Sequence, residues 1–80
     1  MARLYILKNT QDRHYVGITE TEVLERLERH NKGYVKSTKF YKPWSVIYTE
    51  YFSSMSGARR REKQIKSWKG GSAFKKLISV

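Results

Sequence analysis

Eighty residues suffice for one small domain and leave no room for a second. Lysine and arginine number 17 against 7 acidic residues, and the resulting net charge of +10 predicts a polyanionic partner, nucleic acid first. The absence of cysteine excludes disulfides and thiolate metal sites, and the short apolar runs and the N-terminus without an apolar core argue against membrane spanning and export. Membrane binding is disfavoured because the basic residues are spread over the whole chain and no helix combines a basic face with a broad apolar one. We therefore expect a cytoplasmic protein.

The start of the chain predicts a β-hairpin. Residues 4–7 and 14–18 are rich in strand-forming side chains, and the polar stretch between them has the composition of a turn. Gly17 in the second strand indicates a bend or a close approach of another group to the backbone. Pairing of Tyr5 with Tyr15 would place the two phenols side by side on one face of the sheet.

A helix follows the hairpin. Thr19 and Glu22 fit a capping box at its start, and residues 31–33 supply its end. The stripe that should face the sheet consists of Val23, Leu24, Leu27 and Asn31, and the solvated face carries Glu25, Glu28 and Arg29. Arg26 and His30 lie four residues apart along the edge of this stripe and can reach the same point. For His30 the ordinary alternative is a partly exposed histidine favoured by the helix dipole.

The connection from residue 34 to residue 42 mixes aromatic and basic side chains without a clear period. Its lysines are Lys36, Lys39 and Lys42. Two interpretations of Tyr34, Phe40 and Tyr41 remain open: they stack on nucleic-acid bases while the lysines contact phosphates, or they close the edge of a small core.

Residues 44–52 have the strongest strand pattern in the chain, and we expect them to form the central or longest strand. The alternation places Val46, Tyr48 and Phe52 on one face and Ile47 and Tyr51 on the other. Together with the hairpin and the helices, this strand predicts an α+β fold, a small three-stranded and largely antiparallel sheet flanked by helices.

A second helix is predicted from an N-cap at Ser54 to residues 70–71. Glu62 falls in the middle of its sheet-facing stripe, where it must be ion-paired, hydrogen-bonded or bound to a metal, because an isolated buried charge is costly. The rest of the stripe is Met55, Ala58, Ile65 and the alkyl part of Lys69, whereas the other sides carry Arg59, Arg60, Arg61, Lys63 and Lys66 toward solvent or phosphate. Residues 72–80 predict a final short helix that packs Phe74, Leu77 and Ile78 against the body.

Five of these features, in this order, resemble the GIY-YIG nuclease domain, and most of all its small stand-alone bacterial members, related to the nuclease domain of the excinuclease C subunit. The features are the tyrosine of Arg3-Leu4-Tyr5, the triplet Tyr15-Val16-Gly17, the helix with Arg26 and His30-Asn31, the strand entry Pro43-Trp44, and the helical run Arg61-Glu62-Lys63-Gln64-Ile65-Lys66. The resemblance identifies residues 1–80 as a single GIY-YIG nuclease-like domain.

The resemblance implies a phosphodiester hydrolase that depends on Mg²⁺ or Mn²⁺. By correspondence, Glu62 binds the metal, and Arg26 stabilises the phosphate as negative charge accumulates. Tyr5 activates or orients the attacking water with Tyr15 as its partner, and His30 contacts the phosphate or relays a proton. A free phenol has a pKa of about 10, so Tyr5 acts as a base only if cations lower its pKa or if it shares its proton with a partner.

The chain departs from the family pattern at several places. The first motif lacks its glycine and isoleucine, and no asparagine follows the glutamate. Ile18 stands where some relatives carry a lysine, so a second cation at the phosphate is absent or comes from Lys36 or Lys39. Because the segment before the helix arginine is one residue longer than in most relatives, the choice of Arg26 over Arg29 rests on the helical wheel.

The sequence leaves two functions open. The first is an endonuclease acting on DNA, with branched, damaged or single-stranded DNA as its candidate substrates. It contacts the nucleic acid through Lys36, Lys39, Lys42, Arg59, Lys63 and Lys66. The second is a non-catalytic nucleic-acid-binding module on the same scaffold, or a nuclease module that takes its specificity from a protein partner. Cleavage that EDTA abolishes would distinguish the first from the second.

Overall fold

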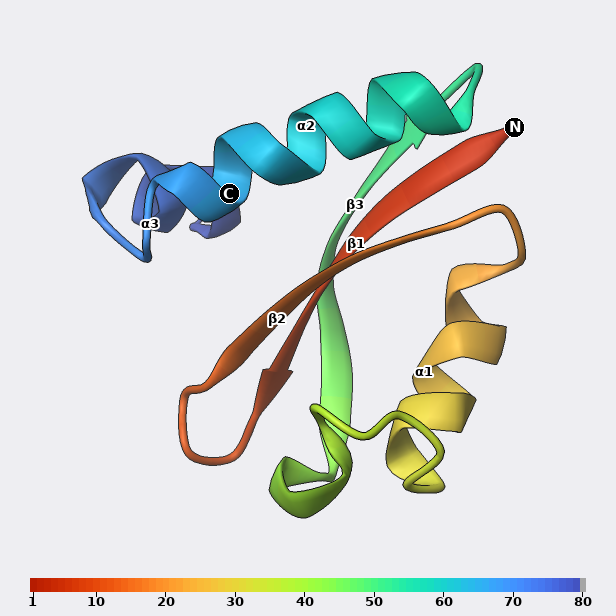
Figure 1. The fold of residues 1–80 in the computed structure, drawn as a ribbon. Helices are drawn as coiled ribbons and strands as arrows, with labels where there is room; N and C mark the ends of the chain where they lie inside the picture. The colour runs from red at the N-terminus through yellow and green to blue at the C-terminus, as the bar shows by residue number, and fades with distance from the viewer. Residues whose placement is uncertain (80) are drawn as a thin grey trace.

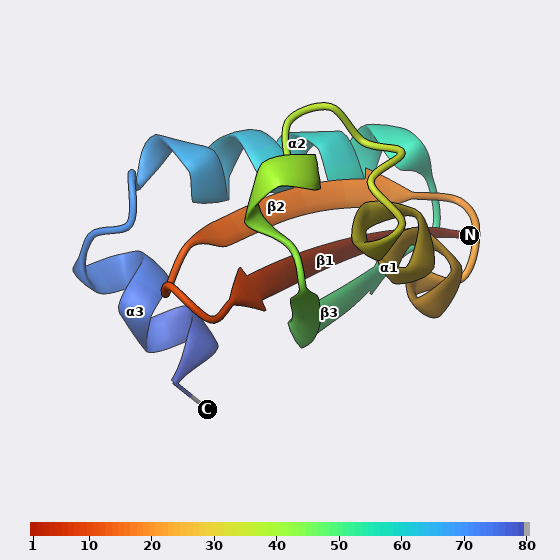
Figure 2. The ribbon, with the colours of Figure 1, turned by 90° about the horizontal axis from the view of Figure 1, so that it is seen from below.

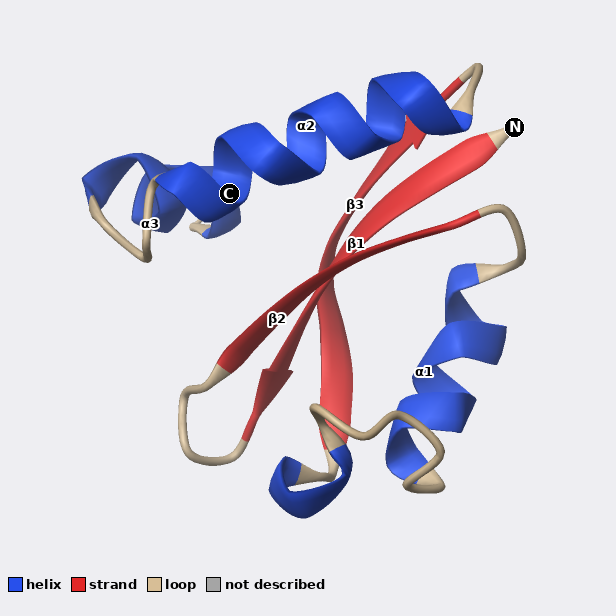
Figure 3. Cartoon of the chain, viewed as in Figure 1, coloured by secondary structure: helices blue, strands red, loops and turns tan. Residues whose placement is uncertain are grey.

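Three antiparallel strands form one open sheet with three helices around it, which confirms the predicted α+β fold (Figures 1 and 3). The structure is a computed structural model that describes residues 1–79. Its elements are β1 (Ala2–Asn9), β2 (His14–Thr19), α1 (Val23–Asn31), the short 3-10 helix η1 (Lys39–Tyr41), β3 (Trp44–Phe52), α2 (Met55–Ser67) and α3 (Ser72–Ile78). Within the described residues, no helix has the length and apolar character needed to cross a membrane.

The strand order is β2-β1-β3, so β1 occupies the centre of the sheet (Figure 2). β3 is the longest strand, with nine residues against eight in β1, but it lies at an edge. Residues 44–52 were expected to form the central or longest strand. They form the longest strand, but not the central one. The consecutive burial of residues 4–7 is the pattern of a central strand covered on both faces.

The hairpin register differs from the predicted one by two residues. Tyr5 pairs with Gly17, and Leu7 pairs with Tyr15, so the expected pairing of Tyr5 with Tyr15 is wrong. Side chains alternate with a period of two, and this shift therefore leaves both phenols on the same face. Their ring centroids are 6.3 Å apart. In the turn, the Asn9 side-chain oxygen accepts two backbone hydrogen bonds, at 3.0 and 2.8 Å.

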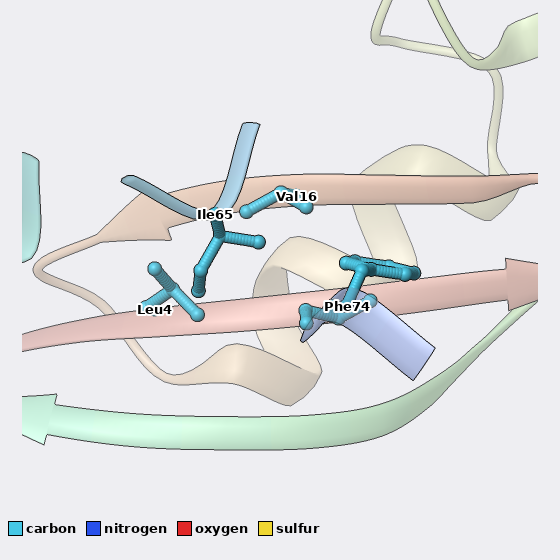
Figure 4. Packing of buried hydrophobic residues seen from close by; sticks show 5 residues of the cluster. Leu4, Val16, Ile65 and Phe74 are labelled. Atoms are coloured by element: carbon cyan, nitrogen blue, oxygen red, sulfur yellow. The ribbon is translucent and has the colours of Figure 1, made fainter. Parts of the chain in front are cut away.

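Each face of the sheet carries its own apolar cluster. The cluster under α2 and α3 consists of Leu4, Ile6, Val16, Ile65 and Phe74 (Figure 4). The cluster toward α1 consists of Tyr5, Leu7, Val23 and Trp44. Burial of Phe74, with Leu77 and Ile78 packed nearby, agrees with the predicted packing of the last helix; Val80, at the end of that predicted helix, lies outside the described residues.

A bulge in β3 changes which of its side chains share a face. Ile6 pairs with Tyr48 and Leu7 pairs with Val46, so Ile47 is an extra residue in the ladder. Val46 therefore packs with the α1 cluster, while Tyr48 packs with the α2 cluster. The prediction that Val46 shares a face with Tyr48 and Phe52 is wrong for this reason.

Helix α1 starts later and is rotated relative to the prediction. Thr19 is the last residue of β2, and α1 begins after Glu22 without a side-chain cap, so the predicted capping box is wrong. Val23 and His30 are buried, whereas Leu24 is 73% exposed, so Leu24 does not belong to the sheet-facing stripe. Exposure of Glu25, Glu28 and Arg29 agrees with the predicted solvated face.

Helix α2 matches its prediction at the start. The Ser54 hydroxyl accepts a hydrogen bond from the Gly57 amide at 3.4 Å, as an N-cap should. Ala58 and Ile65 are buried against the sheet, which confirms that this stripe faces the core.

Candidate active site

Two of the predicted catalytic side chains, Tyr5 and Tyr15, meet at the edge strand β2, where Gly17 provides the space for them. A Cβ atom on Gly17 would lie 2.5 Å from Cζ of Tyr5 and 2.9 Å from Cε2 of Tyr15. Any side chain at this position would displace both phenols. Glycine is thus required where the rings of Tyr5 and Tyr15 cross the backbone, which confirms the predicted close approach.

Tyr5 and His30 form a buried hydrogen-bonded pair. The Tyr5 hydroxyl lies 3.0 Å from Nε2 of His30, and the two side chains are 1% and 0% exposed. The Tyr15 ring lies against the same imidazole, with a centroid distance of 4.7 Å. The alternative of a partly exposed helix histidine is therefore wrong.

Thr38 determines the direction of the hydrogen bonds in this pair. Its hydroxyl lies 2.8 Å from Nδ1 of His30 and donates its only proton to the Val35 carbonyl at 3.3 Å. With its proton directed to Val35, the Thr38 oxygen accepts from Nδ1–H of His30. A neutral His30 then has an unprotonated Nε2, which accepts the proton of Tyr5. Sequence reasoning missed Thr38, since no spacing rule links a helix histidine to a loop threonine eight residues later.

Both members of the pair are uncharged near neutral pH. Burial, and after it the positive charges of Arg26 and Arg29, lowers the pKa of His30 to about 4. Burial raises the pKa of Tyr5 and outweighs the opposite effect of Arg26. The positive charge of Arg26 alone thus does not bring the pKa of Tyr5 below its ordinary value, as the first way for Tyr5 to act as a base would require. The second way, a proton shared with a partner, is available through His30.

Arg26 points toward this pair with an unused donor. Its Nε atom is buried and has no hydrogen-bond partner among residues 1–79. Its charge acts on Tyr5, Tyr15 and His30 and opposes the rise in the pKa of both phenols. Arg29 is instead exposed, with its guanidinium 5.7 Å from the ring centroid of Tyr34. An unsatisfied buried donor costs about 1–3 kcal/mol, so an anionic acceptor fits beside Arg26 better than beside Arg29.

Glu62 approaches the same phenols from α2. It lies on the stripe between Ala58 and Ile65, its side chain is 19% exposed, and its charge contributes to raising the pKa of both Tyr5 and Tyr15. One of its oxygens lies 3.1 Å from Nζ of Lys66. The ion pair considered from the sequence is thus present.

The ion pair of Glu62 leaves the carboxylate available to a second cation. The Lys66 side chain is 56% exposed, and exposed pairs of this kind contribute only about 0.2–1 kcal/mol. Among residues 1–79, no three histidine or acidic side chains gather as a ready-made metal cage. A single carboxylate nevertheless suits Mg²⁺, which keeps several waters and completes its shell with substrate phosphate. The residues present therefore fit such an ion through Glu62 alone.

A half-buried ion pair between β3 and α2 fixes the rotation of α2 that presents Glu62. The Arg61 guanidinium donates to both oxygens of Glu50 at 3.0–3.3 Å, and the Tyr48 hydroxyl donates to the same carboxylate. Burial would raise the pKa of Glu50, but the hydrogen bonds from Arg61 and Tyr48 outweigh burial and lower it. The expectation that Arg61 faces solvent or phosphate is wrong, and the inward position of Glu50 beside Tyr48 was the signal for it.

The predicted nucleic-acid-binding residues are all exposed, but they lie on two separate parts of the chain. Lys36, Lys39 and Lys42 belong to the connection between α1 and β3, and Arg59, Lys63 and Lys66 belong to α2. The aromatic residues of the connection face outward as well: Tyr34 is 66% exposed and Phe40 is 80% exposed. The interpretation that these two rings close a core is therefore wrong.

The two phenols at Gly17, the histidine and arginine of α1 and the glutamate of α2 are the site features to compare with known proteins. A model of the GIY-YIG catalytic domain matches residues 1–76, and the chain belongs to this family of nucleases. It is similar to UPF0213 proteins of Staphylococcus haemolyticus, at 42% identity over 66 residues, and of Staphylococcus aureus, at 35% over 66 residues. Each match covers 81% of this chain and 79% of the relative.

A solved structure shares the fold. The solution NMR structure of a UPF0213 protein from Bacillus halodurans matches with a TM-score of 0.50 and 32% identity. The match covers 84% of this chain and 72% of that chain. The names of these relatives state no activity.

Proposed function

We propose that the protein is a metal-dependent endonuclease that hydrolyses phosphodiester bonds in DNA. The observation that carries the proposal is the unpartnered Nε of Arg26 beside the hydrogen-bonded pair of Tyr5 and His30. A phosphate is an acceptor of the right charge for the Arg26 guanidinium, and the net charge of +10 favours a polyanionic substrate. Phosphate binding at Arg26 would place a phosphorus atom next to the phenol.

The directed hydrogen bonds suggest how a water molecule is activated. The Tyr5 oxygen accepts a proton from the water while the Tyr5 proton moves to Nε2 of His30, and Thr38 holds the opposite ring nitrogen. The resulting hydroxide forms a bond to phosphorus, and the bond from phosphorus to the leaving oxygen breaks. Arg26 donates to a non-bridging oxygen, where charge increases in the transition state.

Substrate binding itself should make His30 a better base. The positive charge of Arg26 is one cause of the low pKa of His30, and a bound phosphate would cancel part of it. The pKa of His30 should therefore rise when the substrate is present. The hydrogen-bonded pair of Tyr5 and His30 would remain uncharged until a phosphate binds. Proton transfer would therefore occur only in the bound state.

Glu62 is the residue that would hold a divalent metal ion. When bound, Mg²⁺ or Mn²⁺ would polarise the phosphate and stabilise the charge on the leaving oxygen. For Glu62 to bind the ion, the Lys66 ammonium must move away or share the carboxylate, and its exposure permits either.

Plasmid nicking tests the proposal. Supercoiled DNA, single-stranded DNA and branched DNA are incubated with the protein and Mg²⁺ or Mn²⁺, with and without EDTA. We expect cleavage that EDTA abolishes and that Glu62→Gln lowers by at least about 100-fold while DNA binding changes little. Undiminished cleavage by Glu62→Gln would contradict its assignment as metal ligand.

The pairing of Glu62 with Lys66 favours a second candidate, a nucleic-acid-binding module without catalysis or one that needs a partner protein for cleavage. Such a module would bind DNA with a steep salt dependence and would be indifferent to EDTA. Lys66→Ala separates the two when nicking is measured at saturating DNA. An enzyme should then nick at an unchanged or higher rate although its affinity for DNA falls, whereas a module should show only the weaker binding.

A further inference from the structure

A basic surface hollow lies next to the proposed active site and is not used by the mechanism above. Its volume is about 470 Å³, and it is lined by Lys32, Gly33, Lys39, Phe40 and Lys42. Lys32 follows His30 by two residues, so the two Cα atoms are within about 7 Å of each other. We refer to these five lining residues as the Phe40 hollow.

The Phe40 ring is held out in solvent by a turn that is firmly attached on both sides. Phe40 is 80% exposed, whereas Thr38 is 1% exposed and its carbonyl accepts from the Trp44 indole at 3.1 Å. The Tyr41 carbonyl accepts from the Asn9 side chain at 2.9 Å. The exposure of Phe40 is therefore not that of a loose loop. A rigid, exposed aromatic ring is a surface on which a planar ligand can stack at little entropic cost.

The charges around this ring are positive. Nζ of Lys39 lies 5.0 Å from the Phe40 centroid, and a Cβ on Gly33 would lie 3.3 Å from Nζ of Lys42. The sequence has no acidic residue between Arg29 and Thr49. Among the lysines of the hollow and within residues 1–79, only Lys32 forms an ion pair, at 3.6 Å from Glu28. The Phe40 hollow thus combines an aromatic face with ammonium groups available to phosphates.

We propose that the Phe40 hollow binds an unpaired nucleotide of the substrate strand, with its base stacked on Phe40 and its phosphates near Lys39 and Lys42. This inference rests on the proposed function for the position of the adjoining phosphate at Arg26. A base within a duplex is already stacked on its neighbours, so its face is not available to Phe40. The protein should therefore prefer nucleic acid that is single-stranded beside the site of cleavage.

A binding experiment in EDTA tests this without requiring cleavage. Fluorescence anisotropy measures the Kd for a labelled single-stranded oligonucleotide and for the same sequence as a duplex. We expect Phe40→Ala to raise the single-strand Kd by about tenfold or more and the duplex Kd less than twofold. Phe40→Trp should retain tight binding, because it keeps an aromatic face. Tyr51→Ala is the matched control, an exposed aromatic of β3, 64% exposed, outside the Phe40 hollow.

Other outcomes would overturn the inference. If Phe40→Ala weakens both forms equally, or no more than Tyr51→Ala does, the hollow does not bind an unpaired base. Plasmid nicking is measured in parallel with the same variants. If the protein nicks the plasmid but Phe40→Ala leaves single-strand binding unchanged, the proposed role of the Phe40 hollow is refuted and the nuclease proposal stands. If the protein prefers single strands in a Phe40-dependent way but cleaves no DNA, the nuclease proposal is refuted and nucleotide binding in the Phe40 hollow is supported.

Discussion

His30 is the residue whose role depends most on its surroundings. Its position four residues after Arg26 marks it in the sequence, but only the fold shows that it joins Tyr5 to Thr38. The unusual consequence is a neutral ring with its proton on Nδ1. Because Thr38 donates to a carbonyl, this tautomer follows from a single hydroxyl group.

The tautomer can be measured directly. In two-bond ¹H–¹⁵N spectra we expect His30 to carry its proton on Nδ1 and to titrate with a pKa of about 4. Thr38→Val removes the hydroxyl that accepts from Nδ1–H and keeps the shape of the side chain. His30 should then populate both neutral tautomers, and the nicking rate should fall by about tenfold, as expected for loss of a group that assists a general base. Thr38→Ser should restore both.

An unchanged tautomer in Thr38→Val would contradict the role assigned to Thr38. His14, the second of the 2 histidines, provides the internal reference. Its imidazole contacts Phe74 and forms no part of the network around Tyr5, so its spectrum should not respond to Thr38→Val.

The individual residues of the site were largely predictable from the sequence, and their connections were not. Tyr5, Tyr15, Arg26 and Glu62 could be singled out by motif and helical position. In the structure the two phenols lie against Gly17, and the charges of Arg26 and Glu62 act on both phenols. Their chemical roles remain predictions. The raised pKa of Tyr5 could not be foreseen, because it comes from burial in the assembled fold.

Among the elements, α2 shows how a structural contact positions a functional one. Arg61 and Glu62 are adjacent, and the pairing of Arg61 with Glu50 on β3 limits rotation of the helix. The other face of α2 remains free for solvent or DNA.

Removing this contact should affect stability. We expect Glu50→Gln to lower the free energy of unfolding by about 1–2 kcal/mol, since a charge-assisted and half-buried network is lost. Urea denaturation measures the change. Glu28→Gln is the matched control, because Glu28 forms an exposed pair with Lys32 and should cost less than about 0.5 kcal/mol. Equal effects of the two changes would exclude a special role for Glu50.

Element types were predictable from the sequence, whereas boundaries and rotations were not. Alternation and capping residues were sufficient for β3 and α2, but one extra residue at Ile47 reversed the side of Val46. The start of α1 was missed because the Thr19 hydroxyl accepts from the Thr21 amide in a local turn, a competing use of the same side chain.

For the molecule as a whole, the buried neutral histidine links folding to pH. The folded pKa of His30, about 4, is below its unfolded value of 6.5, so protonation favours the unfolded chain. Its contribution to stability is complete above about pH 6.5 and decreases as the pH falls toward 4. Below that range, protonation of Glu50 should lower stability further, because its pKa is also reduced in the fold.

Thermal denaturation across this pH range measures the linkage. We expect Tm to fall between pH 6.5 and 4, and His30→Gln to flatten most of the decrease over this interval. His14→Gln should flatten the decrease in Tm less, since the pKa of the exposed His14 is lowered to a smaller extent by burial and Lys8. A profile that His30→Gln leaves unchanged would show that His30 is not buried neutral in solution.

The basic charge of the molecule favours nucleic acid as a partner, whereas the proposed cleavage depends on the site. The most direct measurement is therefore the nicking rate of Arg26→Ala beside that of Arg29→Ala, on supercoiled plasmid with Mg²⁺. Both changes remove one positive charge from α1, but only Arg26 has the unpartnered buried Nε. We predict that Arg26→Ala lowers the rate by about 100- to 1,000-fold and that Arg29→Ala changes it less than threefold. Equal losses in the two variants, or a larger loss in Arg29→Ala, would contradict the proposed phosphate site.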